Sequence, residues 1–73
     1  MLKMTFTSLS PIEWETKREG LDFHIQLERD DYVIDVFDSS IDNADEAYLT
    51  THTCETWEQV ESYCLDYDGI TVI

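Results

Sequence analysis

The stretch IEWETKREGLDFHIQLERDDYVIDVFD, residues 12–38, decides the fold, because apolar and polar residues alternate along most of it. Successive side chains of a β-strand point to opposite faces of the sheet, so this alternation predicts half-buried strands. The alternating apolar residues form three rows: Ile12 and Trp14, continued by Thr16; Leu21, Phe23, Ile25 and Leu27; and Tyr32, Ile34 and Val36.

Two short turns would join these rows into an antiparallel meander. A two-residue loop at Glu19-Gly20 sets the pairs Thr16–Phe23, Trp14–Ile25 and Ile12–Leu27, with Lys17–Asp22 on the other face. A tip at Arg29-Asp30 then sets the pairs Leu27–Tyr32, Ile25–Ile34 and Phe23–Val36. The large side chains thereby share one face of the sheet, and a slip of one residue in either turn would move them to the other face.

The flanking segments have weaker patterns. Residues 1–6, MLKMTF, alternate like a short first strand, and Pro11 indicates a turn or a strand edge after it. Residues 38–47 are rich in turn residues and predict a loop or a short irregular helix. The composition of residues 46–53 favours a fourth strand, and ITVI at 70–73 a last one.

Residues 53–69, TCETWEQVESYCLDYDG, predict a helix. Thr53 or Thr56 could cap its start, Thr56 with Gln59 fits a capping box, and Gly69 is a suitable stop. At 100° per residue, one arc of the helix gathers Trp57, Val60, Tyr63, Cys64 and Tyr67, and the opposite side gathers Glu55, Glu58, Glu61, Ser62 and Asp66.

We therefore expect one domain, residues 1–73, with an α+β fold. It is a small antiparallel β-meander of four to five strands with one amphipathic helix packed on its apolar face. The second sheet face and the outer side of the helix are left to solvent.

Charge is distributed unevenly along the chain. The net charge is −13, and residues 30–73 contain twelve acids and no Lys or Arg, whereas residues 1–29 contain five acids and four bases. So much negative charge would repel nucleic acid and anionic lipid, so we expect neither as a direct ligand.

Two cysteines, Cys54 and Cys64, are too few for a disulfide scaffold. The first residues lack the pattern of a signal peptide, and no apolar run approaches a membrane span of roughly 20 residues. We expect a cytoplasmic protein with free thiols, in a bacterium or a phage-infected host cell.

Metal-binding patterns are incomplete. An EF-hand loop starting at Asp38 would have Asn43 where Gly is required and Leu49 where Glu is required. Loose Ca²⁺ or Mg²⁺ binding by Asp42, Asp45 and Glu46 is the weaker alternative to a solvated acidic loop. Zinc held by His52, Cys54 and Cys64 would need a ligand spacing that matches no common site. We expect no metal and no cofactor.

An enzyme is not expected either. In the predicted sheet, Glu15, His24 and Asp35 are neighbours across three strands, but they would lie on an open face beside no obvious nucleophile. A structural or pH-sensing charge bridge is therefore favoured over catalysis.

The charge itself points to a function. A 73-residue globule is roughly 30 Å across, and duplex DNA of that length carries about 17 charges. Strands and helices would hold carboxylates in regular rows that imitate phosphates. The residues expected to bind the partner are Asp30, Asp31, Asp35, Asp38, Asp42, Asp45, Glu46, Glu55, Glu58 and Glu61.

On this interpretation the chain inhibits a basic nucleic-acid-binding protein, such as a nuclease, a CRISPR effector or a repair enzyme, by occupying its groove. In composition and size alone it resembles small phage-encoded inhibitors of restriction, CRISPR and DNA-repair enzymes. Interfaces also rely on aromatic anchors, for which Tyr32, Phe37 and Tyr48 are candidates, each of which could instead be core.

Two alternatives remain open at the level of sequence. The protein could be a generic acidic interaction module or subunit, or a small protein adapted to high salt. The sequence leaves its oligomeric state open, a dimer included.

Overall fold

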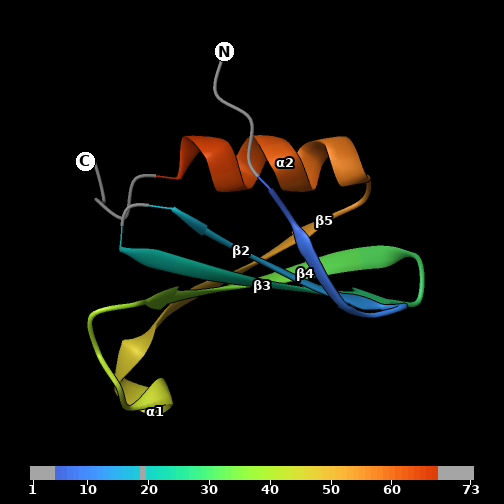
Figure 1. Ribbon diagram of the computed structural model, residues 1–73. Coiled ribbons are helices and arrows are strands. Elements are labelled where there is room, and N and C mark those ends of the chain that lie inside the picture. The colour runs from blue at the N-terminus through green and yellow to red at the C-terminus, as the bar shows by residue number, and fades with distance from the viewer. Residues whose placement is uncertain (1–4, 19, 68–73) are drawn as a thin grey trace.

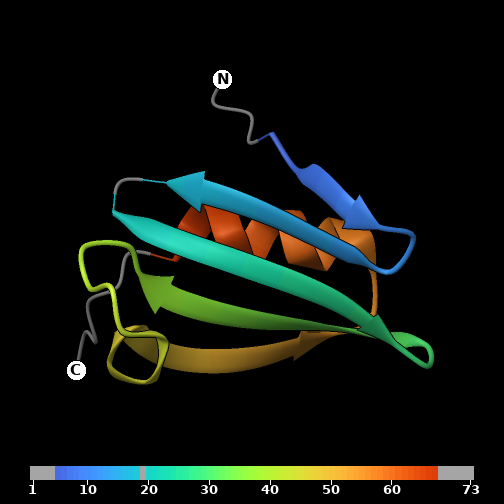
Figure 2. The same ribbon diagram turned by 60° about the horizontal axis from the view of Figure 1, so that its bottom comes forward.

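An antiparallel sheet of five strands organises the residues that the structure describes, 5–18 and 20–67 (Figure 1). In this computed structural model the strands lie side by side in chain order: β1 Thr7–Ser10, β2 Glu13–Arg18, β3 Leu21–Glu28, β4 Asp31–Asp38 and β5 Tyr48–Cys54. The two described helices are α1 Ala44–Ala47, before β5, and α2 Trp57–Asp66, after it. Figure 2 shows the sheet with α2 behind it. The predicted α+β fold is confirmed.

The register of the three central strands is the predicted one. Trp14 pairs with Ile25 and Thr16 with Phe23, and the Leu27 N–H donates to the Ile12 carbonyl over 2.8 Å. The β3–β4 pairs are likewise confirmed: Leu27–Tyr32, Ile25–Ile34 and Phe23–Val36. Ile12 differs from expectation, because it lies in the turn before β2 and is 46% exposed.

Both turns of the meander use left-handed backbone. Gly20 has φ 84°, a conformation that suits glycine, and follows the last β2 residue, Arg18, which pairs with Leu21. Glu19, the other residue of the predicted loop, lies outside the described residues. Arg29 has φ 59°, which strains a residue with a Cβ, and it begins the two-residue turn between Glu28 and Asp31.

The core lies between the sheet and α2. Its fully buried side chains come from both layers: Phe23, Ile25, Ile34, Val36, Val60 and Cys64. An aromatic cluster closes one end of this layer, where the ring of Trp57 lies 5.0 Å from Phe6, 5.1 Å from Trp14 and 5.5 Å from Tyr32. Because Tyr32 packs here, it is a core residue and not a surface anchor.

Helix α2 begins and ends on specific contacts. The Thr56 hydroxyl accepts from the Gln59 N–H, and the Gln59 side chain accepts from the Thr56 N–H, which confirms the predicted capping box. Thr53, the other predicted cap, lies within β5. Near the C-terminal end, Arg18 Nε donates to the Cys64 carbonyl over 3.0 Å, a favourable place for a cation. Gly69 lies outside the described residues.

The predicted first strand, residues 1–6, lies mostly outside the described residues, which begin at Thr5. Thr5 and Phe6 are not part of a strand, and the first described strand, β1, begins at Thr7. Phe6 packs on Trp57, and the Thr16 hydroxyl donates to the Thr5 carbonyl over 2.8 Å. The side chains of Thr7, Ser8 and Leu9 are exposed, so β1 has no hydrophobic alternation that a sequence pattern could detect. Pro11 lies in the expected turn.

The segment after β4 forms the short helix α1, one of the two alternatives predicted there. Asn43 caps it by accepting from the N–H groups of Asp45 and Glu46, and Ala47 is buried. The chain then enters β5 close to the predicted position. The predicted last strand, residues 70–73, lies outside the described residues.

Trp57 is expected to contribute strongly to stability, because its ring joins α2 to three other aromatic side chains. Trp57→Ala should lower the free energy of unfolding by about 3 kcal/mol, measured by urea denaturation followed by circular dichroism. Leu65→Ala, on the exposed side of the same helix, is the control and should change it by less than about 0.5 kcal/mol. Equal effects would contradict this account of the core.

The strain at Arg29 can be measured separately from its charge. Arg29→Gly and Arg29→Ala both remove the guanidinium, but only glycine adopts the left-handed turn conformation without strain. The glycine variant should therefore be more stable than the alanine variant by about 1 kcal/mol in thermal or urea unfolding. If alanine proves equal to or better than glycine, the turn stores no such strain.

Candidate functional site

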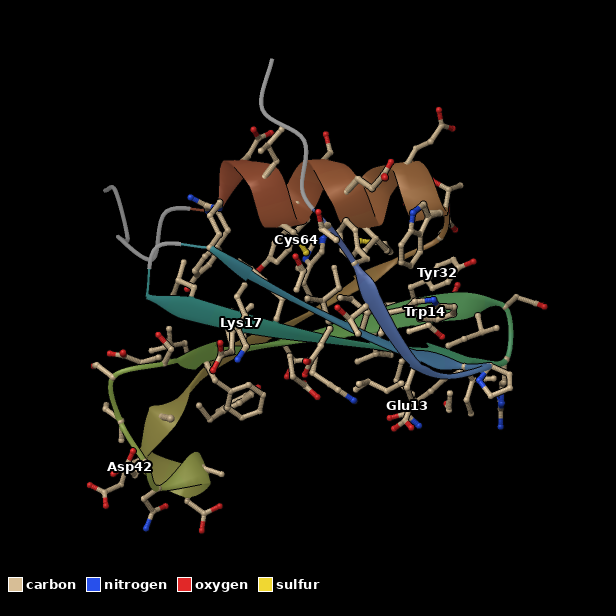
Figure 3. The ribbon with its side chains drawn as sticks, in the orientation of Figure 1. Glu13, Trp14, Lys17, Tyr32, Asp42 and Cys64 are labelled. Carbon is tan, nitrogen blue, oxygen red and sulfur yellow. The ribbon has the colours of Figure 1, made fainter. Side chains whose placement is uncertain are left out.

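The sheet face opposite α2 is polar and negatively charged. Because side chains alternate along each strand, the residues between the core positions all point to this side. Its carboxylates lie on three adjacent strands, and together they are called the acidic face: Glu13 and Glu15 on β2, Asp22 and Glu28 on β3, and Asp31 and Asp35 on β4. In Figure 3, Glu13 points away from α2, whereas Cys64 lies between the helix and the sheet.

A second group of acids lies on the same side of the molecule. Helix α1 is below the sheet in Figure 1, on the side away from α2. It and the loop before it carry three acids, called the α1 corner: Asp42, Asp45 and Glu46. Asp38 ends β4 and pairs with the core residue Leu21, so it does not belong to the open face. The acidic face and the α1 corner together place nine carboxylates on the side of the sheet away from α2.

The structure does not bring all ten predicted partner residues together. Asp31 and Asp35 belong to the acidic face, and the three acids of the α1 corner lie beside it. Asp38 ends β4 opposite Leu21, and Asp30 is at the tip of the β3–β4 turn. Glu55, Glu58 and Glu61 are exposed at the start and on the outer side of α2, across the sheet from the rest. One flat partner surface could not contact both sides of the sheet at once.

The sequence prediction missed four acids of this surface: Glu13, Glu15, Asp22 and Glu28. Residues 1–29 contain five acids and four bases, so this segment looks almost neutral in the sequence. The structure shows that Arg18 points to the other face, where it contacts α2, and that Arg29 sits in a turn. The period-two pattern that identified the core could have found these acids, because they occupy the alternate positions.

His24 lies in the middle of the acidic face. It pairs in register with Glu15 and Asp35, as predicted, but its Nε2 is closest to Glu13 Oε2, at 3.6 Å. This contact is the one side-chain ion pair within 4.0 Å among the described residues, and Lys17–Asp22 is not such a pair. Asp35 instead accepts a hydrogen bond from Thr51 over 2.7 Å. The predicted three-residue bridge is therefore replaced by two separate contacts.

Aromatic side chains interrupt the acids at one end of the sheet. Phe37 and Tyr48 pair across β4 and β5 with ring centroids 5.9 Å apart at an interplanar angle of 67°. Phe37 is partly buried, and Tyr48 is 46% exposed. Of the three candidate anchors, Phe37 and Tyr48 are therefore the two that lie among the acids.

The carboxylate of Asp38, at the end of β4, is engaged by the protein's own donors. The Ser40 hydroxyl and N–H donate to Asp38 Oδ1 at 2.6 and 2.9 Å, which lowers the pKa of this carboxyl and keeps it charged. Asn43 Oδ1 is similarly occupied by the cap of α1. Within the described residues, no group of three or more His, Cys, Asp or Glu side chains is arranged to hold a metal ion.

The three candidate zinc ligands, His52, Cys54 and Cys64, also have other roles in the structure. Cys54 and Cys64 are buried free thiols, and the His52 ring stacks on Tyr63 with centroids 4.1 Å apart. Burial raises the pKa of Cys64 to about 12 and also raises that of Cys54, so neutral thiols dominate at physiological pH. Both cysteines are packing residues in this structure.

The thiols should consequently resist alkylation in the folded protein. We expect iodoacetamide at pH 8 to label Cys64 at least about a hundredfold more slowly in native protein than in urea-unfolded protein, because the thiolate is scarce and buried. Mass spectrometry of timed samples measures the rates. Comparable labelling of native and unfolded protein would show that the core opens readily around Cys64.

Comparison with known proteins adds no relative. No protein-family model matches the chain, and searches of curated proteins and of solved structures each found no match. None of the helices in the described part has the length and apolar character to cross a membrane. Function must therefore be inferred from the acidic face and the α1 corner.

Proposed function

We propose that the protein is an inhibitor that mimics nucleic acid and occupies the basic groove of a nucleic-acid-binding protein. The observation that supports this most is the gathering of nine carboxylates on the side of the sheet away from α2. On this open sheet face, the strand pairing places the acids together with two basic side chains, Lys17 and His24. A cationic groove would meet an almost wholly anionic surface there.

The dimensions fit this proposal. The described part of the molecule extends 29 × 28 × 23 Å, and duplex DNA of similar length carries about 17 charges, against a net −13 for this chain. Along a strand, carboxylates two residues apart are about 6.6 Å from each other, and adjacent strands are about 4.8 Å apart. The sheet therefore fixes a two-dimensional array of charges before binding, which reduces the entropy lost in the complex.

The energetic cost of the surface also favours a functional role. Clustered like charges repel one another and destabilise the compact state. Solubility of a small domain needs a net charge of only about 2–8, and this chain exceeds that range. A partner that supplies Lys and Arg would relieve the repulsion on binding.

Inhibition would follow from simple occupancy. A groove lined by Lys and Arg attracts the acidic face by the same long-range field that attracts DNA, so association is fast and salt-sensitive. Once bound, the protein excludes DNA because both need the same cations. No reaction of the inhibitor is required.

Competition with DNA tests the proposal. Nucleases, CRISPR effectors and repair enzymes, each bound to a short fluorescent duplex, should release the duplex when the protein is added at low salt, as a fall in fluorescence anisotropy. Affinity should drop steeply as salt rises, because the attraction is between exposed charges. Binding without displacement of DNA would favour a generic interaction module instead. Absence of binding across the panel at low salt would refute the proposal.

Two triple variants with equal charge locate the binding surface. Asp42→Asn, Asp45→Asn and Glu46→Gln neutralise three acids of the α1 corner, and Glu55→Gln, Glu58→Gln and Glu61→Gln neutralise three on the other side; all six residues are exposed. The first variant should bind a responsive partner at least about tenfold more weakly, and the second should bind within about threefold of wild type. Equal losses would mean that net charge, and not this surface, determines binding.

A further inference from the structure

The end of the sheet where β4 meets β5 combines aromatic rings with a carboxylate. Phe37 and Tyr48 form one cross-strand pair, and Asp35 and Thr51 form the next pair of side chains along the same face. The rings meet edge to face, and nearly half of Tyr48 remains exposed. A partly exposed aromatic ring, that of Tyr48, therefore lies one pair away from a charged group.

Hydrogen bonds hold that carboxylate in place. The Thr51 hydroxyl donates its one proton to Asp35 Oδ1 over 2.7 Å, so the hydroxyl of Tyr48, which also contacts Thr51 Oγ1, must be the donor in that second contact. Tyr48, Thr51 and Asp35 are thus linked in a chain that fixes the ring relative to the carboxylate. Among the described residues, no further donor reaches Asp35, so its other oxygen can accept from a partner.

Further carboxylates lie near the Phe37–Tyr48 pair. Asp22 is opposite Phe37 on β3, and its Oδ1 is buried without a hydrogen-bond donor from the described residues. Glu46 lies two residues before Tyr48, whereas Asp38 follows Phe37 directly and so points to the opposite face. Asp22 and Asp35 are thus the strand carboxylates next to the rings on the open face, with Lys17 opposite Asp22 on β2. Neither carboxylate forms an ion pair within 4.0 Å among the described residues.

This combination fits arginine better than lysine. A guanidinium is planar, stacks on aromatic rings and donates from a rigid fork that matches a carboxylate, whereas an ammonium is a compact, strongly hydrated charge. A guanidinium lying on the exposed ring of Tyr48 could direct its N–H groups to Asp35. Arginine is also a side chain that DNA-binding proteins commonly use on phosphates.

We propose that the Phe37–Tyr48 pair, together with Asp35, is an arginine-binding site that anchors the partner. The inference rests on the proposed function, because the arginine is one that would otherwise contact a phosphate of the nucleic acid. The remaining acids of the surface attract the partner at long range, and this site supplies the preference for arginine over lysine.

Two small peptides of equal charge test the site directly. The probes are acetyl-Gly-Arg-Arg-Gly-amide and acetyl-Gly-Lys-Lys-Gly-amide, titrated into the ¹⁵N-labelled protein and followed by backbone amide and tyrosine ring resonances. The arginine peptide should bind about two- to fivefold more tightly, as expected for an exposed cation–π contact. The largest shifts should fall on residues of β4 and β5 around Asp35, Phe37, Tyr48 and Thr51.

Three single variants identify the groups responsible. Tyr48→Leu removes the ring at an exposed position and should bring the ratio of the two affinities close to one. Asp35→Asn keeps the acceptor for Thr51 and should weaken arginine binding at least about threefold. Glu58→Gln makes the same charge change on α2 and should leave the ratio unaltered. Thermal unfolding of each variant verifies that the fold is retained.

The outcomes separate this inference from the proposed function. Equal affinities for the two peptides in the wild type, or a ratio that survives Tyr48→Leu, would overturn the arginine site even if the protein displaces DNA from its partner. An arginine preference abolished by Tyr48→Leu would support the site even if the competition experiment failed for every enzyme in the panel. Largest shifts on α2 would also overturn it.

Discussion

The pairing of β2, β3 and β4 is the constraint on which the rest of the structure depends. Two tight turns, at Gly20 and at Arg29-Asp30, leave each strand no freedom to slip. A shift of one residue would turn Ile25 and Ile34 to solvent and bring His24 and Asp35 under α2. The hydrophobic penalty of that exchange would be prohibitive for so small a core. The register therefore fixes the core and the acidic face together.

This coupling explains how a chain of 73 residues with a net charge of −13 can remain folded. The apolar side chains are concentrated between one sheet face and α2, with a cluster of aromatic rings around Trp57. Most carboxylates are kept at the surface, where water screens them, and Asp22, with its buried Oδ1, is an exception. Their repulsion is tolerated because the acids lie outside the hydrophobic core. The same separation leaves one side of the sheet available to a cationic partner.

Much of this could be predicted from period-two alternation and from a capping box, because both are local. The central registers and the Thr56 cap of α2 followed from them. The position of β1 could not be predicted, because its exposed Thr and Ser residues give no hydrophobic pattern and it is held by pairing with β2. The contact between Arg18 and Cys64 joins residues 46 positions apart, so no local rule could reveal that the Arg18 side chain binds the end of α2.

The sequence by itself determined the core side chains of the central strands, Ile12 excepted, because alternation along a strand is a property of the backbone. It also determined the excess of acid after Arg29. Only the tertiary structure decided which acids share a surface: α2 takes Glu58 and Glu61 to one side, and the sheet and α1 place nine others on the opposite side. It alone packed Tyr32 against Trp57 and placed Tyr48 beside Asp35, because strand neighbours and helix packing depend on residues far apart in the chain.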